Sequence, residues 1–174
     1  MQVRSAAASD AALLHELAAV TFPLACPPDA LPESIQAFID QHLSEAAFTR
    51  YLADPQRELF IAEQDAAPLG YAMLVHAEPT DPDVLAALTS LPSSELSKLY
   101  VLPDAHGGGI ATSLVERCVS SARERGAASV WLGVNQLNTR ANRFYEKSGF
   151  ERVGVKRFKV GARYEDDFVR ARIL

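Results

Sequence analysis

The chain has 174 residues, of which 48% are hydrophobic and 22% are charged, as in ordinary soluble globular proteins. We expect one domain that spans residues 1–174. Its apolar stretches are too short for a membrane-spanning helix, which needs about 18 apolar residues in a row. Two distant cysteines, Cys26 and Cys118, give neither a disulfide framework nor a metal-ligand spacing. These features favour a cytoplasmic protein with no secretion signal, no metal site and no membrane contact.

The formal net charge of −5 conceals a difference between the two halves of the chain. Residues 1–98 carry four basic and 14 acidic side chains, whereas residues 99–174 carry 13 basic and eight acidic ones. The first half therefore suits a cationic partner and the second an anionic one, although two solvated faces of opposite sign would give the same counts. A sequence pI of about 5.4 and the lack of a dense basic tract argue against nucleic-acid binding.

Apolar periodicity and turn residues predict short elements in the first half. The first helix should end near Ala19, because four prolines within residues 23–32 are incompatible with regular helix. The expected strands cover residues 2–6, 58–63, 69–76 and 95–101, and the expected helices cover residues 9–19, 33–42 and 44–52, with one helical turn at 83–88.

The second half alternates helices with strands. Two apolar rows at a spacing of four, from Ile110 to Ala122 and from Ala111 to Val119, form one face of a helix over residues 109–125. The other expected elements are a buried strand at 129–134, a helix from Asn138 or Thr139 to Gly149, and strands at 150–155 and 165–173, the last after a turn at Gly161. Such strand–helix–strand units are typical of an α/β or α+β sheet domain with both faces covered.

Residues 106–111 (HGGGIA) form a glycine loop between the strand at 95–101 and the helix at 109–125. Glycines let the backbone approach a ligand, and a helix start offers unpaired N–H groups, so the loop favours a phosphate or pyrophosphate. A sharp turn that binds nothing is the alternative. A nucleotide P-loop lacks support because no Lys-Ser/Thr pair follows Gly109, and the dinucleotide fingerprint fails at Thr112.

Three segments together resemble the GNAT superfamily of acyl-CoA-dependent N-acyltransferases. They are residues 99–103 (LYVLP), the glycine loop, and the series Asn138, Ala141, Phe144, Tyr145, Gly149 and Phe150. They follow that family's order and spacing over residues 94–155, with His106 where the family usually has Gln or Arg. The resemblance implies acetyl-CoA as cofactor and a mixed, mostly antiparallel sheet of six to seven strands. That sheet would be splayed between its fourth and fifth strands, with helices on both faces.

The same resemblance implies an acceptor-side half at residues 1–98 and an acetyl-CoA-binding half at residues 99–174. A bulged strand at 99–101 would offer backbone amides to the pantetheine arm and to the developing oxyanion. Asn138 would contact the pantetheine arm or only cap its helix, and Tyr145 would protonate the departing thiolate or only pack. The residues expected at the cofactor are Leu99, Tyr100, Val101, His106, Gly107, Gly108, Gly109, Ile110, Ala111, Thr112, Asn138, Ala141, Phe144 and Lys147.

The amine acceptor is expected against the first half, whose acidic excess suits a cation. Thr21 and Phe22 form one expected wall, and Tyr71 and His76 form another. Glu95 is the candidate general base, with a solvated carboxylate at a strand end as the alternative. His76 is the second candidate for the base.

These expectations describe an acetyl-CoA-dependent N-acetyltransferase that acts on a primary amine of a small molecule by direct transfer in a ternary complex. A polyamine is the candidate substrate, because further segments resemble the PaiA-type subgroup of bacterial polyamine N-acetyltransferases. They are Thr21-Phe22, residues 60–63 (FIAE) and 131–134 (WLGV), and an ending with Gly154, Phe158, Gly161 and Asp167. Asn135 and Gln136 stand where that subgroup usually has Trp-Glu.

Three other functions stay open at this stage. They are a CoA-binding sensor or inactive module, a protein or peptide N-terminal acetyltransferase, and a nucleotide-binding enzyme that uses the glycine loop. By analogy with such families, a homodimer that pairs C-terminal strands is one expectation for the assembly.

Overall fold

The computed structural model describes residues 1–160 and 162–174. In this part of the chain seven strands form one sheet in the order β1-β2-β3-β4-β5-β7-β6. The neighbours β4 and β5 are parallel, and the other neighbouring pairs are antiparallel. The strands are β1 (Gln2–Ser5), β2 (Arg57–Gln64), β3 (Ala67–Val75), β4 (Ser93–Val101), β5 (Ser129–Asn135), β6 (Glu151–Val160) and β7 (Arg163–Ile173). This mixed, mostly antiparallel sheet confirms the expected fold class.

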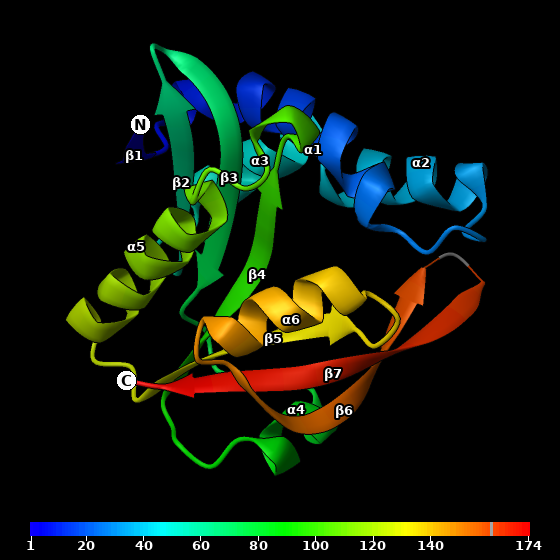
Figure 1. Ribbon diagram of the computed structural model, residues 1–174, viewed down its shortest axis with the longest axis vertical. Helices are drawn as coiled ribbons and strands as arrows, with labels where there is room; N and C mark the ends of the chain where they lie inside the picture. The colour runs from blue at the N-terminus through cyan, green and yellow to red at the C-terminus, as the bar shows by residue number, and fades with distance from the viewer. Residues whose placement is uncertain (161) are drawn as a thin grey trace.

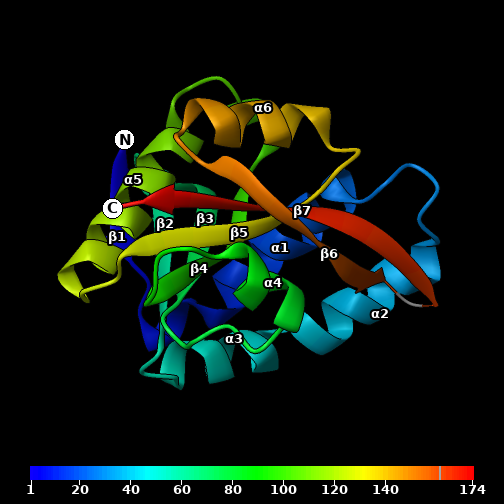
Figure 2. The same ribbon diagram turned by 90° about the horizontal axis from the view of Figure 1, so that it is seen from below.

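Helices cover both faces of the sheet, as Figures 1 and 2 show. The helices are α1 (Ala11–Ala25), α2 (Pro32–His42), α3 (Glu45–Ala53), α4 (Pro82–Ala87), α5 (Ile110–Glu124) and α6 (Thr139–Lys147), with short 3-10 turns at Ala8–Asp10 and Pro103–Ala105. Alternate side chains of a strand serve opposite faces: Phe60 belongs to the core beneath α5 and α6, whereas Ile61 packs with α1, α2 and α3. Among the described helices, none is long and apolar enough to cross a membrane.

The helix α1 continues past its predicted end near Ala19 and includes Pro23. The expectation that regular helix is absent from residues 23–32 was therefore wrong for residues 23–25, and it was also wrong for Pro32, the first residue of α2. Pro23 lies in the last turn of α1, where its missing N–H removes only one intrahelical hydrogen bond. The extension carries Phe22 to β4, where its ring meets the edge of Tyr100 at 6.5 Å between centroids.

The strands β4 and β5 pair only at their beginnings in the described chain, Ser93–Glu95 against Ser129–Trp131. Beyond these residues the strands diverge, and Figure 1 shows β4 and β5 separating at a wide angle. Against β3, the register of β4 shifts so that Ser97 is left unpaired. Such a bulge bends a strand and re-aims its backbone groups. Both the bulge and the splay between the fourth and fifth strands were expected from the family resemblance.

The other elements lie close to their predicted bounds, with two differences that matter for the site. The strand β6 extends to Val160 instead of ending near Val155, so β6 and β7 form a long hairpin. His76 follows the end of β3 instead of belonging to it. The turn expected at Gly161 lies outside the described residues.

Candidate active site

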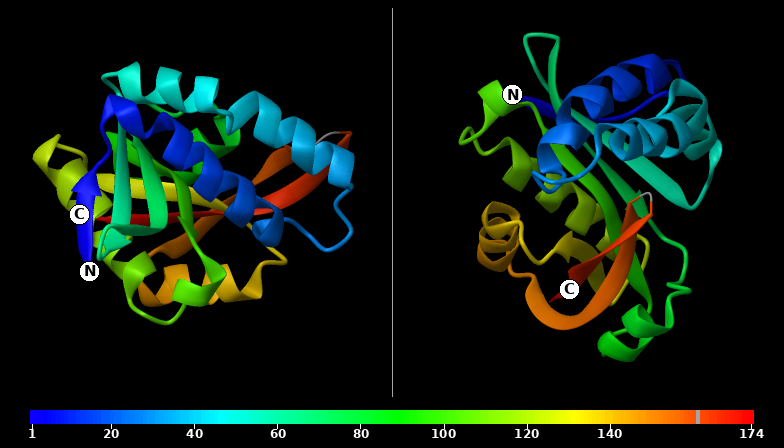
Figure 3. Two further views of the ribbon diagram at one scale, coloured as in Figure 1. Left: turned by 90° about the horizontal axis from the view of Figure 1, so that it is seen from above. Right: turned by 90° about the vertical axis from the view of Figure 1, so that its right-hand side faces the viewer.

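A cleft of about 710 Å³ lies where β4 and β5 part. One wall comes from β4, the glycine loop and the first turns of α5 and α6. The other wall comes from the end of α1, from α2 and from the β6–β7 hairpin, which reaches toward α2 in Figure 3. An ion pair of 3.0 Å between Arg163 and Asp29 joins the hairpin to the segment between α1 and α2.

Most of the residues predicted for the site line this cleft. They are Thr21, Phe22, Glu95, Leu99, Tyr100, Val101, His106, Gly107, Gly109, Ile110, Ala111, Thr112, Asn138, Ala141, Phe144 and Tyr145. Arg140, at the start of α6, lines it as well.

The glycine loop presents backbone N–H groups to the cleft. Gly107 and Gly109 adopt φ values of 84° and 75°, left-handed conformations that favour glycine. The first backbone bond of α5 runs from the N–H of Ser113 to the carbonyl of Gly109, and within the described chain the amides of residues 107–112 have no protein acceptor. A Cβ atom at either glycine would meet no atom within 4 Å. Open space before unpaired amides at a helix start suits a diphosphate.

The edge of β4 beyond Glu95 offers a second set of backbone groups. Because β5 has turned away, residues 96–101 lack a strand partner on that side in the described sheet, and an extended ligand with amide groups can pair there. Asn138 lies nearby and caps α6, since its Oδ1 accepts the N–H of Ala141 at 3.0 Å. The side chain of His106 folds back, with Nε2 at 2.9 Å from the carbonyl of Val101.

Tyr145 lies on α6 beside the free edge of β4. Its ring packs against Phe144 and Phe150, with centroids 5.3 and 5.9 Å away, and the side chain lines the cleft. Burial is the largest cause that raises the pKa of the phenol above its ordinary value, so the hydroxyl stays protonated at neutral pH. The free amides, the free strand edge and this phenol fit a coenzyme A thioester.

Five charged side chains line the cleft away from the glycine loop: Glu95 and Lys98 of β4, and Lys156, Glu165 and Asp167 of the hairpin. Burial raises the pKa of Glu95, an effect that nearby cations oppose. Burial also raises the pKa of Asp167 to about 6 and lowers that of Lys98 to about 8. The sequence reasoning assigned no role to Lys98, Lys156 or Glu165.

Four residues predicted for the site do not line the cleft. Gly108 is not among the lining residues, and Lys147 is exposed at the end of α6. Tyr71 is fully buried beneath α3 and stacks on Tyr100 at 5.7 Å between centroids. Tyr71 is therefore a core residue, and the acceptor wall expected from Tyr71 and His76 does not form.

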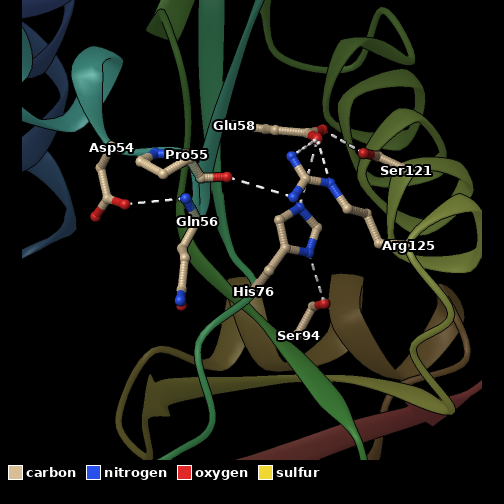
Figure 4. A network of polar contacts seen from close by, with 8 residues as sticks. All are labelled: Asp54, Pro55, Gln56, Glu58, His76, Ser94, Ser121 and Arg125. Atoms are coloured by element: carbon tan, nitrogen blue, oxygen red, sulfur yellow. Dashed lines mark hydrogen bonds and ion pairs between the residues drawn. The ribbon is translucent and has the colours of Figure 1, made fainter.

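His76 belongs to a polar network at the other end of β4, shown in Figure 4. Its Nδ1 lies 3.0 Å from the hydroxyl of Ser94, and its Nε2 lies 3.6 Å from the carboxylate of Glu58. Glu58 also accepts hydrogen bonds from Ser121 and Arg125 of the α5 end. The network joins β2, β3, β4 and α5, and a separate cavity of about 360 Å³ adjoins it.

Comparisons with known proteins agree with this geometry. The profile of the Acetyltransferase (GNAT) family matches residues 14–150. An uncharacterized N-acetyltransferase of Mycobacterium tuberculosis is 47% identical over 166 residues, which cover 95% of this chain and 99% of the relative.

Solved structures share the fold at low sequence identity. The PaiA N-acetyltransferase of Thermoplasma acidophilum, in complex with coenzyme A, aligns with a TM-score of 0.78 at 19% identity over 99% of this chain and 98% of its own. The ribosomal-protein-S18-alanine N-acetyltransferase of Escherichia coli aligns with a TM-score of 0.70 at 20% identity over 99% and 92%. Because the family profile covers most of the chain and a relative of nearly equal extent is 47% identical, this chain belongs to the GNAT family of acetyltransferases.

Proposed function

We propose that this protein transfers the acetyl group of acetyl-CoA to a primary amine of a small molecule, by direct transfer in a ternary complex. The observation that carries the proposal is the meeting of three features in one cleft. These are the unpaired amides of residues 107–112, the free edge of β4 at 96–101, and the phenol of Tyr145. Acetyl-CoA supplies the acetyl group as a thioester.

Each feature has a chemical task in that reaction. The amides of the glycine loop bind the diphosphate, with Arg140 as a nearby cation. The free edge of β4 binds the pantetheine arm, and one of its N–H groups stabilises the charge that develops on the carbonyl oxygen. Asn138 adds an amide group at the same arm. The hydroxyl of Tyr145 donates its proton to the departing sulfur.

The acceptor lies on the side of Thr21, Phe22 and the hairpin. The carboxylates of Glu95, Glu165 and Asp167 line that side, and they attract a protonated amine. A polyamine is the finer candidate, supported by the acidic first half of the chain and by the PaiA N-acetyltransferase among the structural neighbours.

An amine panel tests the proposal: spermidine, spermine, glucosamine and an alanyl peptide, each with acetyl-CoA, with product masses as the readout. The expected result is acetylation of a small amine with release of CoA. Tight CoA binding without transfer to any of these amines would favour a CoA sensor, and acetylation of the peptide alone would favour an N-terminal acetyltransferase.

Tyr145→Phe tests the assignment of the acid within the same assay. General acid catalysis contributes about 10²- to 10⁴-fold, so we expect kcat to fall by at least about 100-fold while the Kd for CoA is unchanged. Tyr164→Phe removes the same hydroxyl from an exposed position on β7 and serves as the matched control. Equal kcat values for Tyr145→Phe and the wild type would refute the assignment.

A further inference from the structure

Asp167 is a buried carboxylate with one oxygen that lacks a hydrogen-bond partner. The residue lies on β7, is only 6% exposed, and lines the cleft. Its Oδ1 is one of four buried side-chain polar atoms that have no hydrogen bond within the described chain; the others are Tyr71 Oη, His76 Nε2 and Trp131 Nε1. The other three residues do not line the cleft. An unpartnered buried carboxylate is costly, so its place in the cleft requires a reason.

The surroundings of Asp167 leave room for this carboxylate. A side chain at Gly133 of β5 would meet Lys156 Cε at 2.6 Å and Asp167 Oδ2 at 3.3 Å. The glycine therefore creates the space in which Lys156 and Asp167, cross-strand partners in the hairpin, approach β5. Oδ2 is the oxygen that faces this packed side, and Oδ1 is left without a partner.

The two carboxylates deeper in the cleft differ in their electrostatic surroundings. The charges that act on Glu95 are all cations: Lys156, Lys98 and Arg57. Asp167 has Lys156 as its cation but also two acidic neighbours on its own strand, Glu165 and Asp166. Lys156 acts on both carboxylates, so the other neighbouring charges make Asp167 the more favourable site for an approaching ammonium group than Glu95.

We propose that Asp167, and not Glu95, is the catalytic proton acceptor that binds the ammonium group of the substrate and takes its proton. This inference rests on the proposed N-acetyltransferase function. The reaction requires a neutral amine, and Asp167 is a buried carboxylate of the cleft whose Oδ1 has no hydrogen-bond partner in the described chain.

The protons balance as follows in the proposed reaction. The carboxylate of Asp167 takes one proton from the ammonium group, which becomes a neutral amine. The nitrogen forms a bond with the acetyl carbon, and the bond between that carbon and sulfur breaks. Tyr145 gives its proton to the sulfur and recovers one from the nitrogen, and Asp167 finally releases its proton to solvent. The sum is one amide, one thiol and one proton.

The pKa of the Asp167 carboxyl suits a proton acceptor. Burial raises the pKa of Asp167 to about 6, against the opposing effect of Lys156. A carboxylate with this pKa is mostly ionised at pH 7 and is still basic enough to accept a proton from an ammonium group held against it.

The test compares Asp167→Asn with Asp166→Asn, which makes the same change at the adjacent exposed position. Spermidine is the first probe, and any other amine that the wild type acetylates replaces it if spermidine does not react. We expect kcat/KM at pH 7 to fall by about 100-fold or more in Asp167→Asn and to fall far less in Asp166→Asn, which removes only a neighbouring charge that acts on Asp167. The Kd for CoA should be the same in both variants, which shows that the fold and the cofactor side are intact.

The pH profile separates a proton acceptor from a structural role. Wild-type kcat/KM should rise with pH through a midpoint near the pKa of Asp167, about 6. In Asp167→Asn this rise of kcat/KM with pH should vanish. The loss of kcat/KM relative to the wild type should shrink as the pH approaches the pKa of the amine, where neutral substrate is abundant. Asp167→Glu should restore the rise of kcat/KM with pH, and Glu95→Gln should retain it. The inference would be overturned if Glu95→Gln lost this rise of kcat/KM with pH and Asp167→Asn kept it.

A second measurement keeps the inference separate from the proposed function. If the wild type acetylates no amine, the proposed function fails, and the carboxyl ¹³C signal of Asp167 then decides whether the group is a poised base. We expect it to titrate near pH 6 in wild-type protein with CoA, and addition of spermidine should shift this midpoint downward. A midpoint below 4, or no response to the amine, would overturn the inference.

Discussion

Gly109→Ala separates the role of the glycine loop in folding from its role in binding. Gly109 is the N-cap of α5 at φ 75°, where a residue with a Cβ atom costs about 1 to 2 kcal/mol. For a chain of this length, that loss lowers Tm by roughly 2 to 8 °C. Gly126, after the other end of α5, has φ 81°, and a Cβ at either glycine would meet no atom within 4 Å. Gly126→Ala should therefore lower Tm by a similar amount.

Only one of these two glycines lines the cleft, Gly109. Its added methyl group projects into the space before the unpaired amides, and relief of the backbone strain moves those amides. Loss of one hydrogen bond to a charged group costs about 1.5 to 3 kcal/mol, which corresponds to a roughly 10- to 150-fold higher Kd. We therefore expect Gly109→Ala to weaken CoA binding by this factor and Gly126→Ala to leave it unchanged.

Isothermal titration calorimetry with CoA and thermal unfolding without it, on the wild type and both variants, measure the two effects separately. An unchanged Kd in Gly109→Ala would mean that the loop does not hold the diphosphate. Equal weakening in both variants would mean that CoA affinity follows global stability, and the reasoning from the open space at Gly109 would fail.

Three further predictions concern stability, each measured by urea denaturation. Arg170 is 7% exposed and donates to the side chain of Asn142 at 2.9 Å and to a backbone carbonyl at 3.0 Å; Arg170→Met leaves both acceptors unpaired and should cost about 3 kcal/mol. Burial raises the pKa of Glu58, but hydrogen bonds from the end of α5 outweigh it and hold the pKa below its ordinary value. This stabilisation is present above the ordinary pKa of Glu58 and is lost as the pH falls through the lower folded pKa. Glu58→Gln should therefore cost about 1 kcal/mol at pH 7, since the pair is partly exposed, and progressively less as the pH falls through the folded pKa. Asp167 has the opposite sign, because its pKa rises from 3.8 to about 6 on folding. Its ionisation destabilises the fold as the pH rises through this window, so Asp167→Asn should add about 2 to 3 kcal/mol at pH 7 and nothing below pH 4.

The cofactor side of the cleft could be predicted because its signals are local in sequence. A glycine run between a strand and an amphipathic helix fixes where unpaired amides lie, whatever the rest of the chain does. The loop at residues 106–111 and the helix start at Asn138 therefore lie where the sequence placed them, and both line the cleft. The predicted contact of Lys147 with the cofactor is not supported, because Lys147 lies at the far end of α6, two turns from Asn138.

The acceptor side depends on contacts that strand periodicity cannot reveal. Simple alternation would put Glu95 and Lys98 on opposite faces of β4, but the bulge at Ser97 brings both into the cleft. Tyr71 lies on a central strand with helices over both faces, so an aromatic residue there fits the core as well as a wall. Asp167 reaches the cleft only because β7 inserts between β5 and β6, an order that the sequence does not specify.

Buried polar groups in this protein fall into two kinds, and the difference bears on the role of Asp167. Arg170 and Ser129 are buried, hydrogen-bonded and not among the residues that line the cleft, and such groups stabilise a unique packing. Asp167 is buried with an unpartnered oxygen and lines the cleft, so its ionisation weakens the fold. A chain that keeps a destabilising carboxylate where a hydrophobic side chain would fit is expected to use it, because strongly perturbed groups concentrate at functional sites. We therefore expect Asp167→Asn to have both a higher stability at pH 7 and a slower acetyl transfer than the wild type.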